Sequence, residues 1–69
     1  MQPVLLAILW TLDNRRVRCE LSKVDLRAWQ LRVLAGDEVL RLAVLDNLPR
    51  TIREAQDWRD DYSRSLKIA

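Results

Sequence analysis

Residues 28–45 read AWQLRVLAGDEVLRLAVL, and the conformation of this stretch decides the fold class. Gly36-Asp37 fits a two-residue hairpin loop with glycine at its first position. Side chains alternate between the two faces of a strand, so this loop places apolar residues together on one face. The pairs on that face are Val33–Leu40, Leu31–Leu42 and Trp29–Val44. The pairs on the opposite face are Leu34–Val39, Arg32–Arg41, Gln30–Ala43 and Ala28–Leu45.

A helix is the competing interpretation of this stretch. Residues 25–35 are rich in Leu, Arg, Ala and Gln, which favour helix. Ser22 with Asp25 has the spacing of a capping box, and Gly36 could end the helix. Short apolar runs do not separate the two structures by periodicity alone. The strand interpretation is preferred because an independent turn upstream also yields a register with one apolar face.

That upstream turn is the polar stretch 13–16, Asp-Asn-Arg-Arg, whose first two residue types tolerate tight turns. Working outward from it, one face pairs Leu12 with Val17, Trp10 with Cys19 and Ile8 with Leu21. The other face pairs Thr11 with Arg18, Leu9 with Glu20 and Ala7 with Ser22. The sequence therefore predicts a first hairpin before the one at Gly36.

A helix is expected at the C-terminal end of the chain, because apolar residues recur there every three or four positions. They are Ile52, Ala55, Trp58, Tyr62 and Leu66. Thr51 and Glu54 have the spacing of a capping box. Asn47 is the rival cap, with Pro49 inside the first turn.

The sequence thus predicts an α+β fold, a four-stranded antiparallel meander with one C-terminal amphipathic α-helix packed on one face of the sheet. Strands are expected at about residues 4–12, 17–23, 28–35 and 39–45, and the helix at about 50–66, all in one small domain. The helix would lie across Trp10, Cys19, Trp29, Leu31 and Leu42. The pattern of Trp29, Leu31, Val33, Gly36 and Val39 before an amphipathic helix resembles that of many short bacterial proteins.

The residue types present argue against an enzyme. The chain has no histidine, so the usual general base and nucleophile pairs are missing. Cys19 falls on the inward face and is expected to pack in the core, and Gly36 is the only glycine, so no phosphate-binding loop exists. Acidic residues on the helix alternate with arginines, which indicates a solvated face and not a metal site. They are Glu54, Asp57, Asp60 and Asp61. We therefore expect no cofactor, no metal and no small-molecule substrate.

The longest apolar run, Val4–Trp10, is too short to span a membrane and lacks the flanking features of a secretion signal. A cytoplasmic protein with no membrane partner is the expectation. Net charge is +2, from 12 basic and 10 acidic residues, which by itself does not imply a nucleic-acid partner.

One helix can cover only one face of the sheet, and the opposite face is too apolar to be simply solvated. A chain of 69 residues is also marginally stable by itself. We therefore expect a protein–protein interaction module, foremost a homodimer that buries this face or the edge of the first strand. The interface residues predicted are Leu9, Arg18, Arg32, Leu34, Val39, Arg41 and Leu45. A heteromeric inhibitor, adaptor or subunit is one alternative. Anion or nucleic-acid binding is the other, through Arg15, Arg16, Arg18, Arg32 and Arg41.

Overall fold

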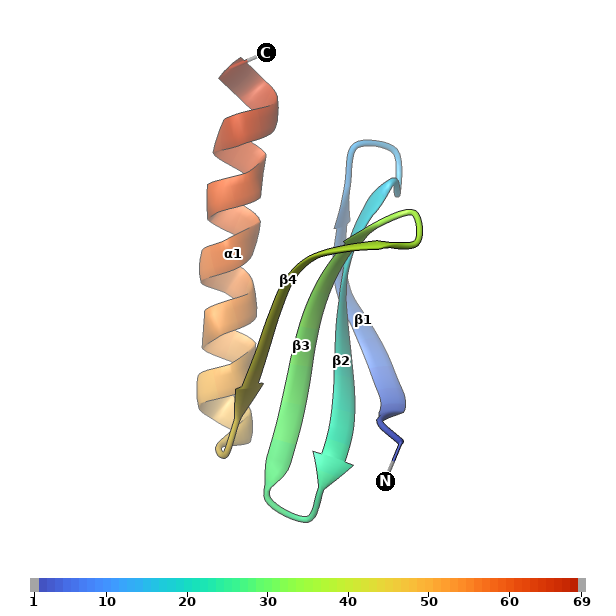
Figure 1. Cartoon of the computed structure of the whole chain (residues 1–69). Helices are drawn as coiled ribbons and strands as arrows, with labels where there is room; N and C mark the ends of the chain where they lie inside the picture. The colour runs from blue at the N-terminus through green and yellow to red at the C-terminus, as the bar shows by residue number, and fades with distance from the viewer. Residues whose placement is uncertain (1, 69) are drawn as a thin grey trace.

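The computed structural model describes residues 2–68, and side chains through residue 65. Four strands, β1 (Val4–Leu12), β2 (Val17–Asp25), β3 (Ala28–Ala35) and β4 (Glu38–Leu45), precede the helix α1 (Leu48–Ile68). The strands form one antiparallel sheet in the order β1-β2-β3-β4 (Figure 1). The predicted fold is confirmed, with β2 reaching two residues further than expected.

The core lies between one face of the sheet and α1, and we call this the inner face. Cys19, Leu31 and Val33 are completely buried there, and Ala55 and Trp58 of the helix close over them. The indole Nε1 of Trp10 donates a 2.7 Å hydrogen bond to the carbonyl oxygen of Ala55. This bond satisfies the polar end of a buried tryptophan and ties β1 to the helix. The predicted packing of Leu66 concerns a side chain outside the described residues.

Both predicted hairpin turns are present. Gly36 has φ 63°, a conformation that L residues rarely adopt. The N–H of Gly36 donates a hydrogen bond to the carbonyl oxygen of Arg16. In the first turn, Asp13, Asn14 and Arg15 all have positive φ, at 53°, 56° and 70°. Asp and Asn tolerate this left-handed region, whereas Arg15 occupies it with steric strain.

A bulge in β4 makes the predicted register of the second hairpin wrong beyond its first pair. Leu34 pairs with Val39 as expected, but Val33 then pairs with Arg41, so Leu40 is the extra residue. Such a bulge exchanges the two faces for the rest of the strand. Consequently the predicted pairs Val33–Leu40, Leu31–Leu42, Trp29–Val44, Arg32–Arg41, Gln30–Ala43 and Ala28–Leu45 do not form.

Two bulges in β1 likewise alter the first hairpin. Leu12, Thr11 and Trp10 pair as predicted, but Leu9 is an extra residue and Ile8 lies opposite Glu20 instead of Leu21. A second extra residue, Leu6, follows three positions earlier, so Leu5 pairs with Ser22 and Ala7 pairs with Leu21. The predicted pairs Ile8–Leu21, Leu9–Glu20 and Ala7–Ser22 are therefore wrong.

The helix starts two residues earlier than predicted, at Leu48, and its cap is Asn47. The Oδ1 atom of Asn47 accepts a 3.0 Å hydrogen bond from the N–H of Arg50. Thr51 does not act as the cap. Its buried hydroxyl instead donates a 2.7 Å bond to the carbonyl oxygen of Asn47, inside the first turn.

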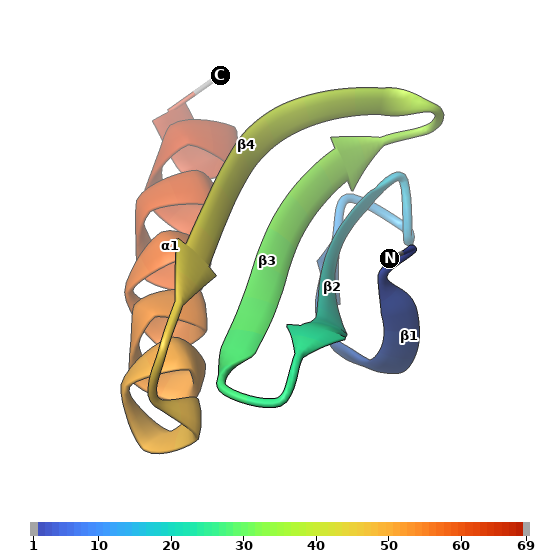
Figure 2. The same cartoon turned by 60° about the horizontal axis from the view of Figure 1, so that its bottom comes forward.

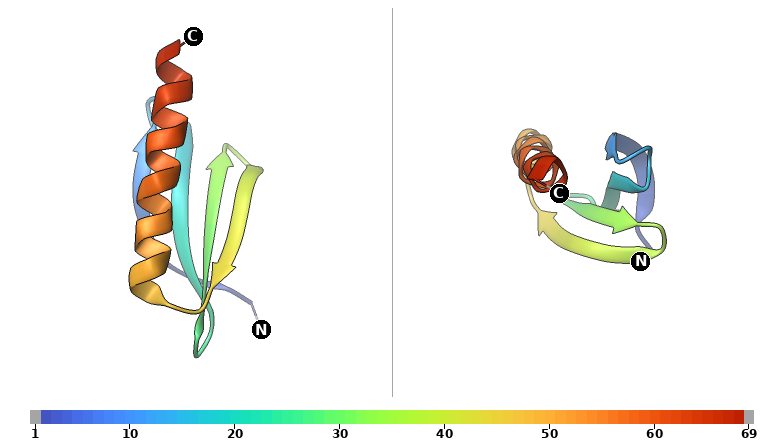
Figure 3. Two further views of the ribbon diagram at one scale, coloured as in Figure 1. Left: turned by 90° about the vertical axis from the view of Figure 1, so that its left-hand side faces the viewer. Right: turned by 90° about the horizontal axis from the view of Figure 1, so that it is seen from above.

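The sheet is strongly curved, and β3 and β4 bend along their lengths (Figure 2). Figure 3 shows α1 running along one side of the sheet, with its last turns extending past the strands. The molecule measures 40 × 23 × 15 Å and exposes 5185 Å². A typical monomer of 8.1 kDa exposes about 4,500 Å², so this chain exposes about 700 Å² more.

Candidate interaction surface on the outer face of the sheet

The centre of the sheet's outer face, opposite the helix, carries a compact ion-pair triad. Glu20 lies on β2, where its Oε1 accepts a 2.7 Å hydrogen bond from Nη2 of Arg32 on β3. Its Oε2 accepts a 3.0 Å bond from Nε of Arg18. Arg18 also reaches the carbonyl oxygen of Gly36 at the hairpin. One carboxylate therefore fixes two guanidinium groups on neighbouring strands.

The carboxylate of the triad is largely removed from water, because the Glu20 side chain is only 10% exposed, whereas Arg18 and Arg32 are 29% and 36% exposed. Burial alone would raise the pKa of Glu20, but the hydrogen bonds and positive charges of Arg18 and Arg32 outweigh burial and lower that pKa below its ordinary value. Glu20 is consequently ionised at neutral pH, and the triad carries one net positive charge. The Nε atom of Arg32 is buried and has no hydrogen-bond partner among the described residues.

Large apolar residues surround the triad on both edge strands. The register places Leu5 and Ile8 of β1 on this face, because they pair with Ser22 and Glu20. The register also places three residues of β4 on the outer face, because they pair with outer-face residues of β3. The pairs are Val39 with Leu34, Leu42 with Arg32 and Val44 with Gln30. These five apolar side chains are each 46% to 55% exposed. A sheet face with a buried carboxylate at its centre and half-exposed apolar side chains around it differs from an ordinary solvated sheet face.

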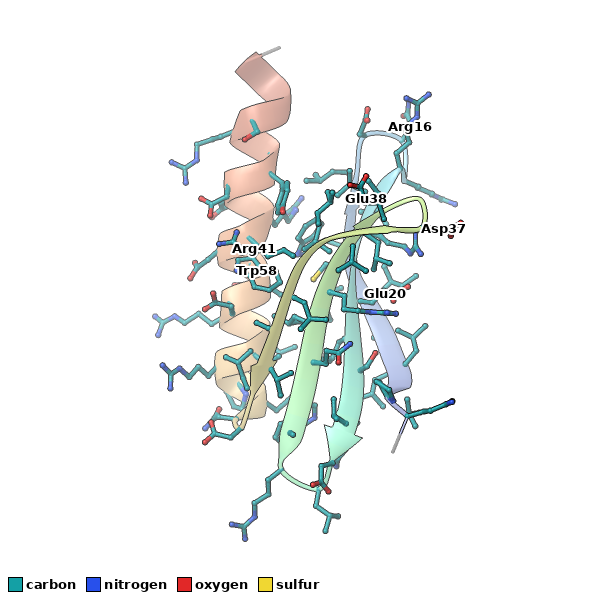
Figure 4. The ribbon with its side chains drawn as sticks, in the orientation of Figure 1. Arg16, Glu20, Asp37, Glu38, Arg41 and Trp58 are labelled. Carbon is teal, nitrogen blue, oxygen red and sulfur yellow. The ribbon has the colours of Figure 1, made fainter. Side chains whose placement is uncertain are left out.

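Three of the predicted interface residues do not lie on this surface. Arg41 faces the helix because of the bulge at Leu40, with its guanidinium 4.8 Å from the ring centre of Trp58 and 3.8 Å from Asp61 (Figure 4). Leu9 and Leu45 pack against the core cluster. The bulge brings Leu9 toward the core beside Trp10, and Leu45 pairs with Trp29 on the inner face.

The other four predicted interface residues, Arg18, Arg32, Leu34 and Val39, do share the outer face. Leu34 is buried there, and Val39 is exposed. The residues that the sequence did not assign to this face are Leu5, Ile8, Leu42 and Val44. Their apolar character was visible in the sequence, but the bulges that turn them outward have no comparable sequence signal.

The five arginines predicted to bind an anion are not gathered into one patch. Arg18 and Arg32 share the carboxylate of Glu20, and Arg41 is on the opposite face. Arg15 and Arg16 are exposed in the first turn, at the end of the sheet where Figure 4 labels Arg16. The arrangement spreads the positive charge over two faces and one loop.

Reactive groups on the inner face are sparse. Cys19 is completely buried, and burial, aided by the nearby negative charge of Glu20, raises the pKa of its thiol to about 11. The thiol is therefore neutral and unreactive at physiological pH. The described residues, 2–68, contain no group of three or more His, Cys, Asp or Glu side chains placed to hold a metal ion.

Two hollows adjoin the N-terminal half of β1. One, of about 320 Å³, opens on the outer face and is lined by Gln2, Pro3, Leu5, Glu20, Ser22 and Arg32. The other, of about 430 Å³, is mainly apolar and is lined by Gln2, Val4, Leu6, Lys23, Val24, Asp25 and Leu26. Both are shallow surface features that border the same edge strand, and neither contains a nucleophile paired with a base.

No protein-family model, curated protein or solved structure matches this chain. Within residues 2–68, no helix is both long and apolar enough to cross a membrane.

Proposed function

We propose that the chain is a non-enzymatic interaction module that associates with a second copy of itself. The observation that carries this proposal is the set of half-exposed apolar residues on the two edge strands. They are Val4, Leu5, Leu6 and Ile8 of β1 and Val39, Leu40, Leu42 and Val44 of β4. Soluble monomers seldom leave such residues next to one another on their surface.

The exposed area supports association with a partner of similar size. The chain exposes 5185 Å², about 700 Å² more than a typical monomer of its mass. A standard protein–protein interface buries about 800 Å² on each partner. The two areas agree in magnitude, although the last turns of α1, which extend past the sheet (Figure 1), account for part of the excess.

The triad offers an orienting element for such an interface. The side chains of Arg18 and Arg32 remain 29% and 36% exposed, so their guanidinium groups can still donate hydrogen bonds to acceptors on a partner. The internal Glu20 bridge lowers the cost of burying the two arginines, because it compensates one of their two positive charges. Apolar residues around a positive, partly satisfied centre suit a protein partner better than a phosphate backbone.

Sedimentation velocity at two protein concentrations tests the proposal. We expect a mass near twice 8.1 kDa at the higher concentration, with a shift toward 8.1 kDa on dilution. The midpoint of thermal unfolding should rise with protein concentration, because association stabilises the folded state by mass action. A particle that remains at 8.1 kDa at concentrations on the order of 1 mM would disprove self-association, since any dimer would then have a Kd well above about 1 mM.

A further inference from the structure

The two edge strands differ in how well they are protected against pairing with another chain. Proteins protect exposed edges with charged residues, prolines or bulges. β1 spans Val4–Leu12, nine residues that include no charge and no proline. β4 is also bulged, but it carries Glu38 and Arg41. The two bulges are the only such protection that β1 has, so β1 is the more open edge.

The N-terminal half of β1 is apolar and exposed on both faces of the sheet. Leu5 and Ile8 lie on the outer face, and Val4 and Leu6, at 62% and 50% exposed, line the apolar hollow of about 430 Å³. A body that covered only the outer face would leave Val4 and Leu6 in water. A strand placed beside β1 contacts side chains on both faces, because its own side chains alternate.

Symmetry favours pairing of β1 with its own copy. Two identical antiparallel strands are related by a two-fold axis perpendicular to the sheet, and the contact closes at two subunits. Pairing of β1 with β4 of another copy would leave one edge free at each end and continue into a filament. The bulges at Leu6 and Leu9 interrupt the regular strand, so pairing centres on the short stretch around Ala7 and Ile8.

We propose that β1 of one copy pairs antiparallel with β1 of a second copy around Ile8, joining the two four-stranded sheets edge to edge. This inference rests on the proposed self-association and names its geometry. The partner is a second copy because an uncharged apolar strand is complementary to itself, because the pairing closes at two subunits, and because the excess exposed area is of the magnitude that one partner of a standard interface buries. In the dimer, Val4, Leu5, Leu6 and Ile8 of each copy meet residues of the other, and the charged β4 strands form the outer edges.

Self-cross-linking of single engineered cysteines tests the geometry. A residue near the two-fold axis of an antiparallel pair lies about 4.5–5.5 Å from its own copy, between Cα atoms, which suits a disulfide. The native Cys19 does not compete, because it is buried with a thiol pKa of about 11. We compare Ile8→Cys, at the proposed two-fold axis, with Leu42→Cys and Val44→Cys under mild oxidation. The Ile8→Cys variant should form a reducible covalent dimer at least tenfold faster than the β4 variants.

A charge substitution gives a second readout. Leu6 and Leu40 are exposed bulged leucines, one on each edge strand, 50% and 42% exposed, so they form a matched pair. Leu6→Lys should weaken self-association at least tenfold in sedimentation, and Leu40→Lys should change it less than threefold. Circular dichroism spectra like that of the wild type would show that both variants keep the fold.

The outcomes separate the two proposals. A wild-type chain that sediments as a monomer overturns self-association itself. A wild-type dimer that cross-links at Leu42 or Val44 but not in β1 overturns strand pairing and indicates that the outer faces stack. Equal effects of Leu6→Lys and Leu40→Lys also overturn pairing through β1, and a complex with a different protein in place of a second copy does the same.

Discussion

Replacing Glu20 by glutamine should destabilise the fold at neutral pH and have little effect in acid. Glutamine keeps the shape and one oxygen acceptor but loses the negative charge that holds Arg18 and Arg32 at 3.0 and 2.7 Å. A hydrogen bond to a charged group contributes about 1.5–3 kcal/mol. Because Arg32 is 36% exposed, solvent screening reduces the loss, and we expect Glu20→Gln to cost about 2 kcal/mol.

The pH dependence follows from the lowered pKa of Glu20. In the unfolded chain this carboxyl titrates near its ordinary pKa, about 4.3. Its contribution to stability is therefore complete above that pH and is lost as the pH falls through the lower pKa of the folded state. Urea unfolding at a fixed protein concentration should show the difference between wild type and Glu20→Gln shrinking steadily below about pH 4.

Glu38→Gln is the matched control, because Glu38 is an exposed residue of β4 with no ion pair among the described residues. Its free energy of unfolding should stay within about 0.5 kcal/mol of the wild type. The reasoning is refuted if Glu20→Gln loses as much stability at pH 3 as at pH 7. It is also refuted if the Glu38 control loses an equal amount.

Three further predictions concern the helix cap, the first turn and the core thiol. Asn47→Ala should lower the free energy of unfolding by about 1 kcal/mol in urea titration, because the N–H of Arg50 loses its side-chain acceptor. Asn47→Asp keeps an acceptor at this position, so its free energy of unfolding should stay near that of the wild type. Arg15→Gly should raise the free energy of unfolding by up to about 1 kcal/mol, since Arg15 has φ 70° and glycine adopts this conformation without strain. Arg16→Gly should give no such gain, because Arg16 is not among the residues with positive φ. Burial raises the pKa of Cys19 to about 11 from an ordinary 9.0. The free energy of unfolding should therefore be unaffected by this thiol below about pH 9 and fall by about 2–3 kcal/mol as the pH rises to about 11. Cys19→Ala should remove that fall.

The sequence predicts the elements well because its turn signals are strong. The glycine at Gly36 fixes the second hairpin, and the polar stretch 13–16 fixes the first. Near each turn the register also follows, as the pairs Leu12–Val17 and Leu34–Val39 show. Local chemistry therefore determines the strand order and the first residue pairs.

Beyond the first pairs, the sequence pattern fails because it assumes strict alternation. In β4, a regular strand would put Arg41 on the outer face and Leu42 in the core. The bulge at Leu40 instead places Arg41 over the Trp58 ring and leaves Leu42 half exposed. A run in which nearly every residue is apolar looks the same in either register, so the sequence alone gives no reason to expect the slip.

The geometry of one helix on four strands explains why both edges remain apolar and exposed. A helix with its side chains is about 10–12 Å wide, and neighbouring strands lie about 4.8 Å apart, so one helix shelters little more than two strands. The central strands accordingly contribute the most deeply buried residues of the inner face, namely Cys19 and Leu21 of β2 and Leu31 and Val33 of β3. A second helix could cover the edges, but the described chain has only α1. The proposed pairing of two β1 strands would protect one of the two exposed edges without a second helix, because the more apolar edge strand of each sheet would then lie inside a continuous sheet made of two four-stranded sheets. It leaves β4 at the margins, the strand whose Glu38 and Arg41 already oppose further addition.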